Sequence, residues 1–296
     1  MTGAAPAAAT LRRVPRTCYF HAGCPDGFGA AYSAWRAWGE RGRYVPRGHE
    51  DPFDPLAHEG DLVVFADIAP TNAQLRDLGE VAERVVVLDH HFSARQSFEA
   101  DPSLAIFLAG RGHRVHFDLE HSGAVLAWQY FHPDDPVPDL LRYVEDQDLW
   151  TWKLPASEAV NAAIGSYPRE IEVWDDLARR PWEELAQEGE PIVRAMRTEV
   201  VRSLRFAHPL RIDELRLEAV NSVHHRSHIG HAVAARAAFG AKIAAVYRIS
   251  GTRVDVSLYS IGEFDVSAVA ARFGGGGHRN AAGFAVTLRD WLERFV

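Results

Sequence analysis

Apolar residues in the first half of the chain gather in short runs without polar alternation. Three such runs stand at 17–21, 61–66 and 84–88. Short runs rich in β-branched residues are typical of strands that are covered on both faces, as in a parallel sheet. Helix-period patterns follow them, at 28–38, 72–83, 123–131 and 139–144, and Ser122 is placed to cap the third of these helices. This order predicts an α/β domain built on a parallel sheet.

A long polar–apolar helical pattern separates this half from a second α/β unit. It runs from about Trp182 to Phe206, and Gly189 and Pro191 inside it predict that the helix begins or kinks there. Strand and helix patterns alternate again behind it, at 215–220, 230–239, 242–248, 254–258, 266–272 and 283–286. We therefore expect four parts: a disordered tail at 1–16, a sheet domain at 17–181, a helical linker at 182–210 and a smaller α/β domain at 211–296.

Composition narrows the class of protein. The chain has 296 residues, 47% of them hydrophobic and 24% charged, which suffices for one large domain or two smaller ones. It contains no run of 18 apolar residues, so we expect no membrane span, and its start lacks the pattern of a secretory signal. Two cysteines, Cys18 and Cys24, make no disulfide framework, which fits a cytoplasmic protein.

The net charge bears on the substrate. The formal charge is -8, from 40 acidic and 32 basic residues. Proteins that grip long nucleic acids usually have a basic surface, because neutralising phosphates supplies most of their affinity. The balance favours a small or short anionic substrate held in a pocket.

Acidic and histidine side chains stand where the three predicted strands end. The residues at these ends, or in the loop behind them, are His21, Asp26, Asp67, Asp89, His90 and His91. Sites in open α/β sheets form at the carboxyl ends of the strands, so we expect these groups to share one crevice. A further acid, Asp146 with Asp148 near it, follows the helix at 139–144 and could close the set.

Carboxylates packed so closely repel one another unless cations lie between them. Mixed carboxylate and imidazole ligands with almost no thiolate suit Mn²⁺ or Mg²⁺, ahead of Zn²⁺ or Fe²⁺. Two such ions can activate a water and stabilise the charge of a phosphoryl displacement. The sequence therefore predicts two divalent cations, with Mn²⁺ ahead of Mg²⁺.

Five segments in a fixed order carry a family resemblance. They are HAGCPDGFGAA (21–31), VVFAD (63–67), VVVLDHH (85–91), EDQDLW (145–150) and FGGGGHRNAAGF (273–284). By these segments the chain resembles the DHH phosphoesterase superfamily in its DHH/DHHA1 branch. That branch includes nanoRNA-degrading phosphodiesterases, nucleotide phosphatases and the RecJ single-strand exonucleases. The resemblance implies a DHH catalytic domain, a helical linker and a smaller C-terminal DHHA1-like domain that binds substrate.

The resemblance also implies a role for each residue. His21 and Asp26 match ligands of two different metals, and Asp67 matches the carboxylate that bridges them. His90 matches the histidine ligand of the second metal, with Asp146 as its distal carboxylate and Asp148 ranked below.

The two neighbours of His90 take supporting roles in the same pattern. Asp89 would orient His90, and His91 would contact the substrate phosphate and aid charge or proton transfer. Cys24 departs from the pattern, because family members usually carry an aspartate there. Its softer sulfur either binds a softer ion, leaves the first metal site weak, or is simply a small buried thiol.

The glycine-rich segment resembles the family's substrate-binding motif. Consecutive glycines let the backbone approach a ligand and present N–H groups to an anion, and arginine can hold a phosphate through two hydrogen bonds. The residues expected to bind substrate are Gly275, Gly276, Gly277, His278 and Arg279. A second departure stands upstream, where Tyr259 replaces an arginine that relatives often carry.

Two further groups are given structural interpretations. The histidines between 224 and 231 are expected to be solvated or part of a linker, and Trp150 and Trp152 to belong to the core rather than to stack on a base.

The function expected from these motifs is metal-dependent hydrolysis of phosphodiester or phosphomonoester bonds in nucleotides or short oligonucleotides, through two-metal activation of water. Two alternatives stay open: a single-strand exonuclease, and a catalytically degenerate protein that binds nucleotides or nucleic acid. The exact substrate, the cleavage polarity, the metal and any homodimer stay open as well.

Overall fold

A computed structural model describes residues 14–295. The expected tail lies for the most part outside the described residues, but strand β1 already begins at Arg16. Five parallel strands form the N-terminal sheet, in the order β2-β1-β3-β4-β5. Their bounds are β1 Arg16–His21, β2 Arg43–Arg47, β3 Leu62–Ala66, β4 Arg84–Asp89 and β5 Arg114–Phe117. The parallel sheet confirms the predicted fold class, although β2 and β5, which are short and rich in arginine, were not expected.

Helices cover both faces of this sheet. Their bounds are α1 Pro25–Trp38, α2 Asn72–Val81, α3 Phe92–Glu99, α4 Pro102–Gly110 and α5 Gly123–Phe131, with the 3-10 turns η1 Gly39–Arg41 and η2 Pro55–His58. Alternate strand residues point to opposite faces, so Val64 and Val86 pack with α1 and α5, and Val63 and Val85 pack with α2 and α4. Ser122 caps α5 as expected, through a hydrogen bond from the amide of Val125. This three-layer arrangement buries the strands and leaves their carboxyl ends at one edge.

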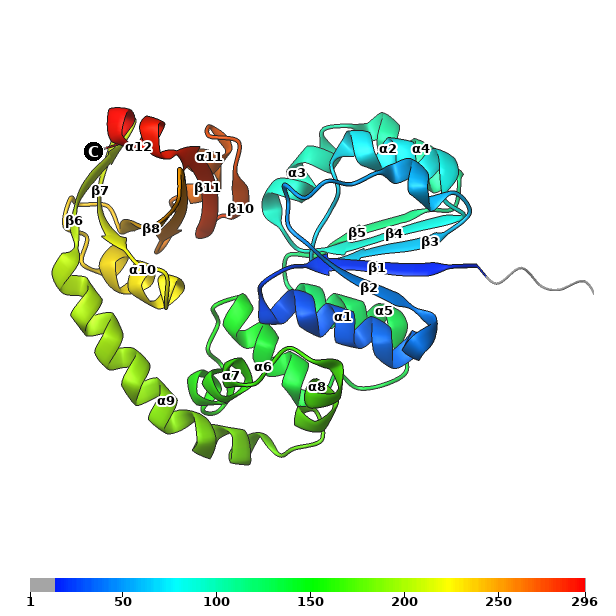
Figure 1. The fold of residues 1–296 in the computed structure, drawn as a ribbon, viewed down its shortest axis with the longest axis horizontal. Helices are drawn as coiled ribbons and strands as arrows, with labels where there is room; N and C mark the ends of the chain where they lie inside the picture. The colour runs from blue at the N-terminus through cyan, green and yellow to red at the C-terminus, as the bar shows by residue number, and fades with distance from the viewer. Residues whose placement is uncertain (1–13, 296) are drawn as a thin grey trace, which may run out of the picture.

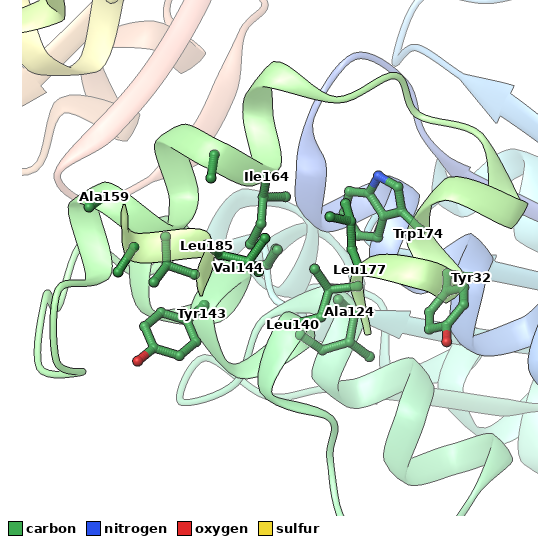
Figure 2. Close-up of a cluster of buried hydrophobic side chains, with 14 of the residues drawn as sticks. Tyr32, Ala124, Leu140, Tyr143, Val144, Ala159, Ile164, Trp174, Leu177 and Leu185 are labelled. Carbon is green, nitrogen blue, oxygen red and sulfur yellow. The ribbon is translucent and has the colours of Figure 1, made fainter. Parts of the chain in front are cut away.

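A layer of helices lies beyond α1 and α5. Its members are α6 Asp139–Asp148, α7 Ser157–Ser166, α8 Ile171–Leu177 and α9 Trp182–Ser203, followed by η3 Leu204–Phe206. Figure 2 shows their shared core, in which Leu140, Ile164, Trp174 and Leu185 gather. Helix α9 is continuous from Trp182, so the expectation that it begins near Gly189 or Pro191 is wrong. Glycine at 189 permits close packing on α7, because a Cβ there would lie 1.7 Å from the Ala159 carbonyl oxygen.

The C-terminal part contains a second, mixed sheet in the order β10-β11-β9-β8-β7-β6, in which β7 and β8 are parallel and the other neighbours antiparallel. The strands are β6 His208–Ile212, β7 Leu215–Asn221, β8 Ile243–Ser250, β9 Arg253–Ser260, β10 Gly276–His278 and β11 Ala281–Thr287. The helices are α10 Arg226–Ala235, α11 Val266–Ala271 and α12 Leu288–Arg294. Helix α10 begins four residues before the predicted start at 230, because the chain turns into it at His225, which has a positive φ of 51°.

Helix α9 carries the chain from the helical layer to the second sheet, and that sheet turns back toward the first (Figure 1). Strand β10 contacts α3 of the N-terminal part. Helix α10 also contacts the N-terminal part, since the imidazole of His231 stacks on Trp150 with ring centroids 4.1 Å apart. His228 and His231 are therefore inter-domain contacts rather than the solvated or linker residues that were expected. Within residues 14–295, none of the helices combines the length and apolarity that crossing a bilayer requires.

Candidate metal centre

Asp67 lies at the middle of the carboxyl edge of the N-terminal sheet. It directly follows β3, is 1% exposed, and adopts a left-handed backbone conformation with a φ of 61°. Its amide donates to the Leu88 carbonyl of β4, at 2.9 Å. The start of α5 presses against it, because a Cβ at Gly123 would lie 2.3 Å from the Asp67 Cβ. Asp67 is thus held from β4 and α5, with its two carboxylate oxygens facing different neighbours.

One oxygen of Asp67 faces a histidine and a cysteine. Asp67 Oδ2 lies 3.5 Å from His21 Nδ1 and 3.3 Å from Cys24 Sγ, and these two atoms are 3.5 Å apart. The Cys24 sulfur also caps α1, since it accepts a hydrogen bond of 3.2 Å from the amide of Gly27. Cys24 is therefore not merely a buried thiol, because it completes a set of three ligand atoms with His21 and Asp67.

The other oxygen of Asp67 faces a second set. Asp67 Oδ1 accepts a hydrogen bond of 3.0 Å from His90 Nε2, and Asp26 Oδ2 lies 3.6 Å from the same nitrogen. Asp148 Oδ2 approaches that nitrogen as well, at 3.5 Å, from the last turn of α6. Asp26 is held in place by the start of α5, whose Gly123 and Ala124 amides donate to its carboxylate at 2.7 and 3.1 Å. Asp67 therefore belongs to both sets, as a bridging carboxylate would.

The structure places Asp146, the expected distal ligand, elsewhere. Its carboxylate accepts hydrogen bonds from the hydroxyl of Thr151 and from the amides of Lys153 and Leu154, the latter two at 2.8 and 3.1 Å. Burial favours the neutral acid, but hydrogen bonds from Ser157, Thr151 and these amides hold the pKa of Asp146 below its ordinary value. Asp146 organises the loop behind α6, and Asp148 takes the position beside His90 that was expected for Asp146.

Asp89 also differs from the expectation. Its Oδ1 accepts from the backbone amide of His90, at 2.8 Å, and from the ring Nδ1 of His91, at 2.7 Å. It therefore orients the imidazole of His91, whereas the ring Nδ1 of His90 is buried without a hydrogen-bond partner in the described chain. With Nδ1 fixed by Asp89, the Nε2 atom of His91 is left to face other groups.

His278 reaches this centre from the C-terminal sheet. Its imidazole stacks on that of His91 at 4.8 Å and lies 4.6 Å from that of His90. The amide of Gly277 donates to Ser93 Oγ in α3, at 3.0 Å, and a Cβ at Gly276 would lie 2.7 Å from the same hydroxyl. The lack of side chains at these glycines lets β10 close against α3.

Two residues of the second sheet do not join this group. The guanidinium of Arg279 donates to the backbone carbonyl of Glu263 and pairs with its carboxylate at 2.9 Å, so it is held away from the expected phosphate-binding role. The ring of Tyr259 is buried against α10, where a Cβ at Gly230 would lie 2.0 Å from it. Tyr259 is a core residue and presents no stacking surface to a substrate.

His49 was missed in the sequence. Its ring lies 5.1 Å from that of His21 and 5.9 Å from that of His91. Burial and these two histidines lower the pKa of His49 to about 4, which keeps it neutral. His49 follows β2, so it obeys the same strand-end rule as the other residues; the strand sequence RYVPR simply lacks the apolar run that would have revealed it.

The charge balance of the centre fits bound cations. Burial and the carboxylates of Asp67 and Asp148 raise the pKa of Asp26 well above its ordinary value, while burial raises the pKa of Asp148. Burial also opposes the charge on Asp67, but hydrogen bonds from His21 and His90 hold its pKa well below the ordinary value. In the described chain, the ion pairs of these three carboxylates involve only histidines. The oxygen-rich set suits Mn²⁺ or Mg²⁺, and the Cys24 set is softer.

Comparison with known proteins adds to this picture. Residues 219–296 match the family model described as the DHHA1 domain. The chain is 26% identical over 292 residues to the uncharacterized protein R106 of Acanthamoeba polyphaga mimivirus. That alignment covers 90% of this chain and 66% of the viral protein, so the chain spans just under two thirds of that relative's length.

Among solved structures, the DHH domain of a protein described as a member of a ribosomal-protein family matches 95% of this chain and 84% of its own, with 14% identity and a TM-score of 0.53. A pGpG-specific phosphodiesterase from Vibrio cholerae matches 94% of this chain and 95% of its own, with 12% identity and a TM-score of 0.42, from which we draw nothing. The fold is thus that of a DHH domain in front of a DHHA1 domain, and the chain belongs to the DHH superfamily.

Proposed function

We propose that this protein is a metal-dependent phosphoesterase that hydrolyses nucleotides or short oligonucleotides. The observation that carries the proposal is the position of Asp67, whose two oxygens face two separate sets of ligand atoms. His21, Cys24 and Asp67 would hold one divalent cation, and Asp26, Asp67, His90 and Asp148 the other. Bound there, such ions supply Lewis-acid stabilisation of charge on phosphoryl oxygens and activation of water.

The protein's own groups around these sets fit a phosphate ester. Asp89 fixes the ring of His91 through Nδ1, which leaves Nε2 to exchange a hydrogen bond or a proton with a substrate oxygen. Burial and the neighbouring imidazoles of His91 and His90 lower the pKa of His278 well below its ordinary value, so this ring is neutral and offers one donor and one acceptor. Because His278 comes from the second sheet, closing β10 on α3 brings it to the ester and excludes water.

A short substrate is favoured over a long strand for two reasons. The formal net charge is -8, which opposes the general attraction that long nucleic acids require. The one arginine of the glycine-rich segment, Arg279, is engaged by Glu263 rather than presented to a phosphate chain. A nucleotide-sized ester needs only the enclosed region between β10 and α3.

The test is a hydrolysis screen with the full chain, stripped of metal and supplied with Mn²⁺. Substrates are a dinucleotide, a cyclic dinucleotide, a nucleoside bisphosphate, pyrophosphate and a long single strand, with products separated by chromatography. We expect turnover of the short esters. In Asp67→Asn we expect turnover to fall by roughly 10³-fold, the scale of removing one charge-stabilising group.

Asp134→Asn is the matched control, because Asp134 is an exposed loop residue outside the centre. It should keep full activity. Normal turnover by the Asp67→Asn variant would refute the proposal, as would the absence of hydrolysis with every substrate. Faster turnover of the long strand would instead favour the single-strand exonuclease.

A further inference from the structure

A cavity of about 730 Å³ lies between the loop behind α6, helix α9 and helix α10. Its lining contains none of the ligand-set residues around Asp67. The groups that matter for recognition are Trp150, Trp152, Glu190, Arg194, Arg197 and His228. The volume is in the range of small-molecule sites and suits one nucleotide-sized ligand rather than a polymer.

The two indoles of this cavity are held in place by the loop that carries them. Trp150 and Trp152 both have positive φ angles, of 55° and 51°, a conformation that non-glycine residues adopt only when their surroundings impose it. Asp146 imposes it here, since its carboxylate accepts hydrogen bonds from the loop residues that follow. Asp146 therefore does not bind a metal but sets two tryptophans at the wall of a cavity.

The two indoles are not equally available. Trp150 is covered on one face by His231, with ring planes only 13° apart, and it contacts Trp152 edge to face at 5.0 Å. Trp152 is half-buried, and its nearest aromatic partner from α10 is His228, at 6.0 Å. Trp152 therefore offers an indole face to a planar ligand, on which a nucleobase can stack.

The polar groups supply both edges of such a ligand. His228 Nε2 is buried without a hydrogen-bond partner in the described chain, although Glu158 Oε1 lies 3.9 Å away. Arg197 is engaged by Glu158, whereas Arg194 and Glu190 form no ion pair within residues 14–295. A neutral imidazole and a carboxylate suit the donors and acceptors of a base, and the unpaired guanidinium suits one phosphate.

From these contacts we propose that the cavity binds a nucleoside monophosphate, with the base against Trp152 and the phosphate toward Arg194. A quaternary ammonium ion, the other ligand that indoles recognise, fits less well, because two arginines line the cavity and one face of Trp150 is occupied. The site goes beyond the proposed hydrolysis and does not depend on it. It adjoins the centre through the chain itself, since Trp150 follows Asp148 by two residues, and it touches both domains through the stack of Trp150 on His231.

The test is calorimetric titration of the full chain in EDTA, so that the centre around Asp67 holds no cation. AMP and GMP are the ligands, and adenosine, inorganic phosphate and choline are the comparison arms. We expect one nucleotide bound per chain, weaker binding of adenosine, and no binding of phosphate or choline at the same concentrations. The Asp67→Asn variant should bind AMP as the parent does.

Variants of the lining give the sharper result. Trp152→Leu and Arg194→Gln should each weaken AMP binding about tenfold or more, and Trp152→Phe should recover part of the loss. Arg202→Gln is the matched control, an exposed arginine of the same helix that pairs with Glu199 outside the cavity. Arg194 is exposed as well, so its variant tests the site even if the tryptophan variant does not fold.

The proposal is overturned if neither lining variant changes AMP affinity, if choline binds more tightly than AMP, or if no nucleotide binds. It is supported if AMP binding depends on both residues and survives in Asp67→Asn. Failure of hydrolysis with retained, Trp152-dependent binding would count against the proposed enzyme function and leave this site standing.

Discussion

Replacing Asp146 and Asp148 one at a time should produce opposite effects on stability and metal binding. The two carboxylates are separated by one residue at the end of α6, yet Asp146 faces the loop behind the helix and Asp148 faces His90. In Asp146→Ala, three donors are left without their acceptor: the Thr151 hydroxyl and the amides of Lys153 and Leu154. In Asp148→Asn, the charge that approaches His90 Nε2 at 3.5 Å is removed.

The expected magnitudes follow from these contacts. A hydrogen bond to a charged group contributes about 1.5–3 kcal/mol when both partners are buried. Lys153 and Thr151 are exposed enough for water to replace part of this, so about 1 kcal/mol per bond is the better value, or about 3 kcal/mol in all for Asp146→Ala. For Asp148→Asn, the weaker attraction to His90 is offset by relief of repulsion with Asp67 and Asp26. The metal-free variant should stay within about 0.5 kcal/mol of the parent.

Two measurements separate the variants. Urea unfolding in EDTA, followed by circular dichroism, gives the free energy of unfolding, and calorimetric titration with Mn²⁺ gives the metal affinity. Asp148→Asn should bind Mn²⁺ at least roughly tenfold more weakly, because a charged ligand is removed, while Asp146→Asn, which keeps an acceptor oxygen, should bind it nearly as the parent does. The reasoning is refuted if Asp148→Asn binds Mn²⁺ normally, or if Asp146→Ala keeps full stability and no longer binds the metal.

Three further outcomes are expected. Gly123→Ala should abolish Mn²⁺-dependent hydrolysis, since its Cβ would lie 2.3 Å from that of Asp67, whereas Gly165→Ala, with nothing within 4 Å, should leave activity unchanged; equal activity of the two variants would contradict this. Ser93→Ala removes the acceptor of the Gly277 amide at 3.0 Å, so steady-state kinetics should show KM raised about three- to tenfold, and a fall in kcat alone would argue against a role in closure. Dialysis against EDTA should stop hydrolysis, and Mn²⁺ at about a hundred times its Kd should restore it and add about 2.7 kcal/mol to the free energy of unfolding; an unchanged unfolding curve would mean that no ion binds.

Much of the fold could be predicted because its signals are local. The apolar runs that became β1, β3 and β4 are buried on both faces, and burial on both faces leaves a mark in the sequence that needs no knowledge of the partner. The short strands β2 and β5 carry arginines and little apolar character, so their place in the sheet comes from pairing with β1 and β4. His49 was missed for that reason alone.

The sequence by itself determined that acids and histidines stand at strand ends, since parallel strands deliver their carboxyl ends to one edge. It could not determine which of two close neighbours faces that edge. Asp146 and Asp148 lie about 200° apart around a helix, and His278 and Arg279 lie at the end of a strand, where adjacent side chains point to opposite faces. Only the docking of α6 and of β10 decided that Asp148 and His278 point inward. The same docking, through Trp150 and His231, formed the second cavity from residues that no local pattern connects.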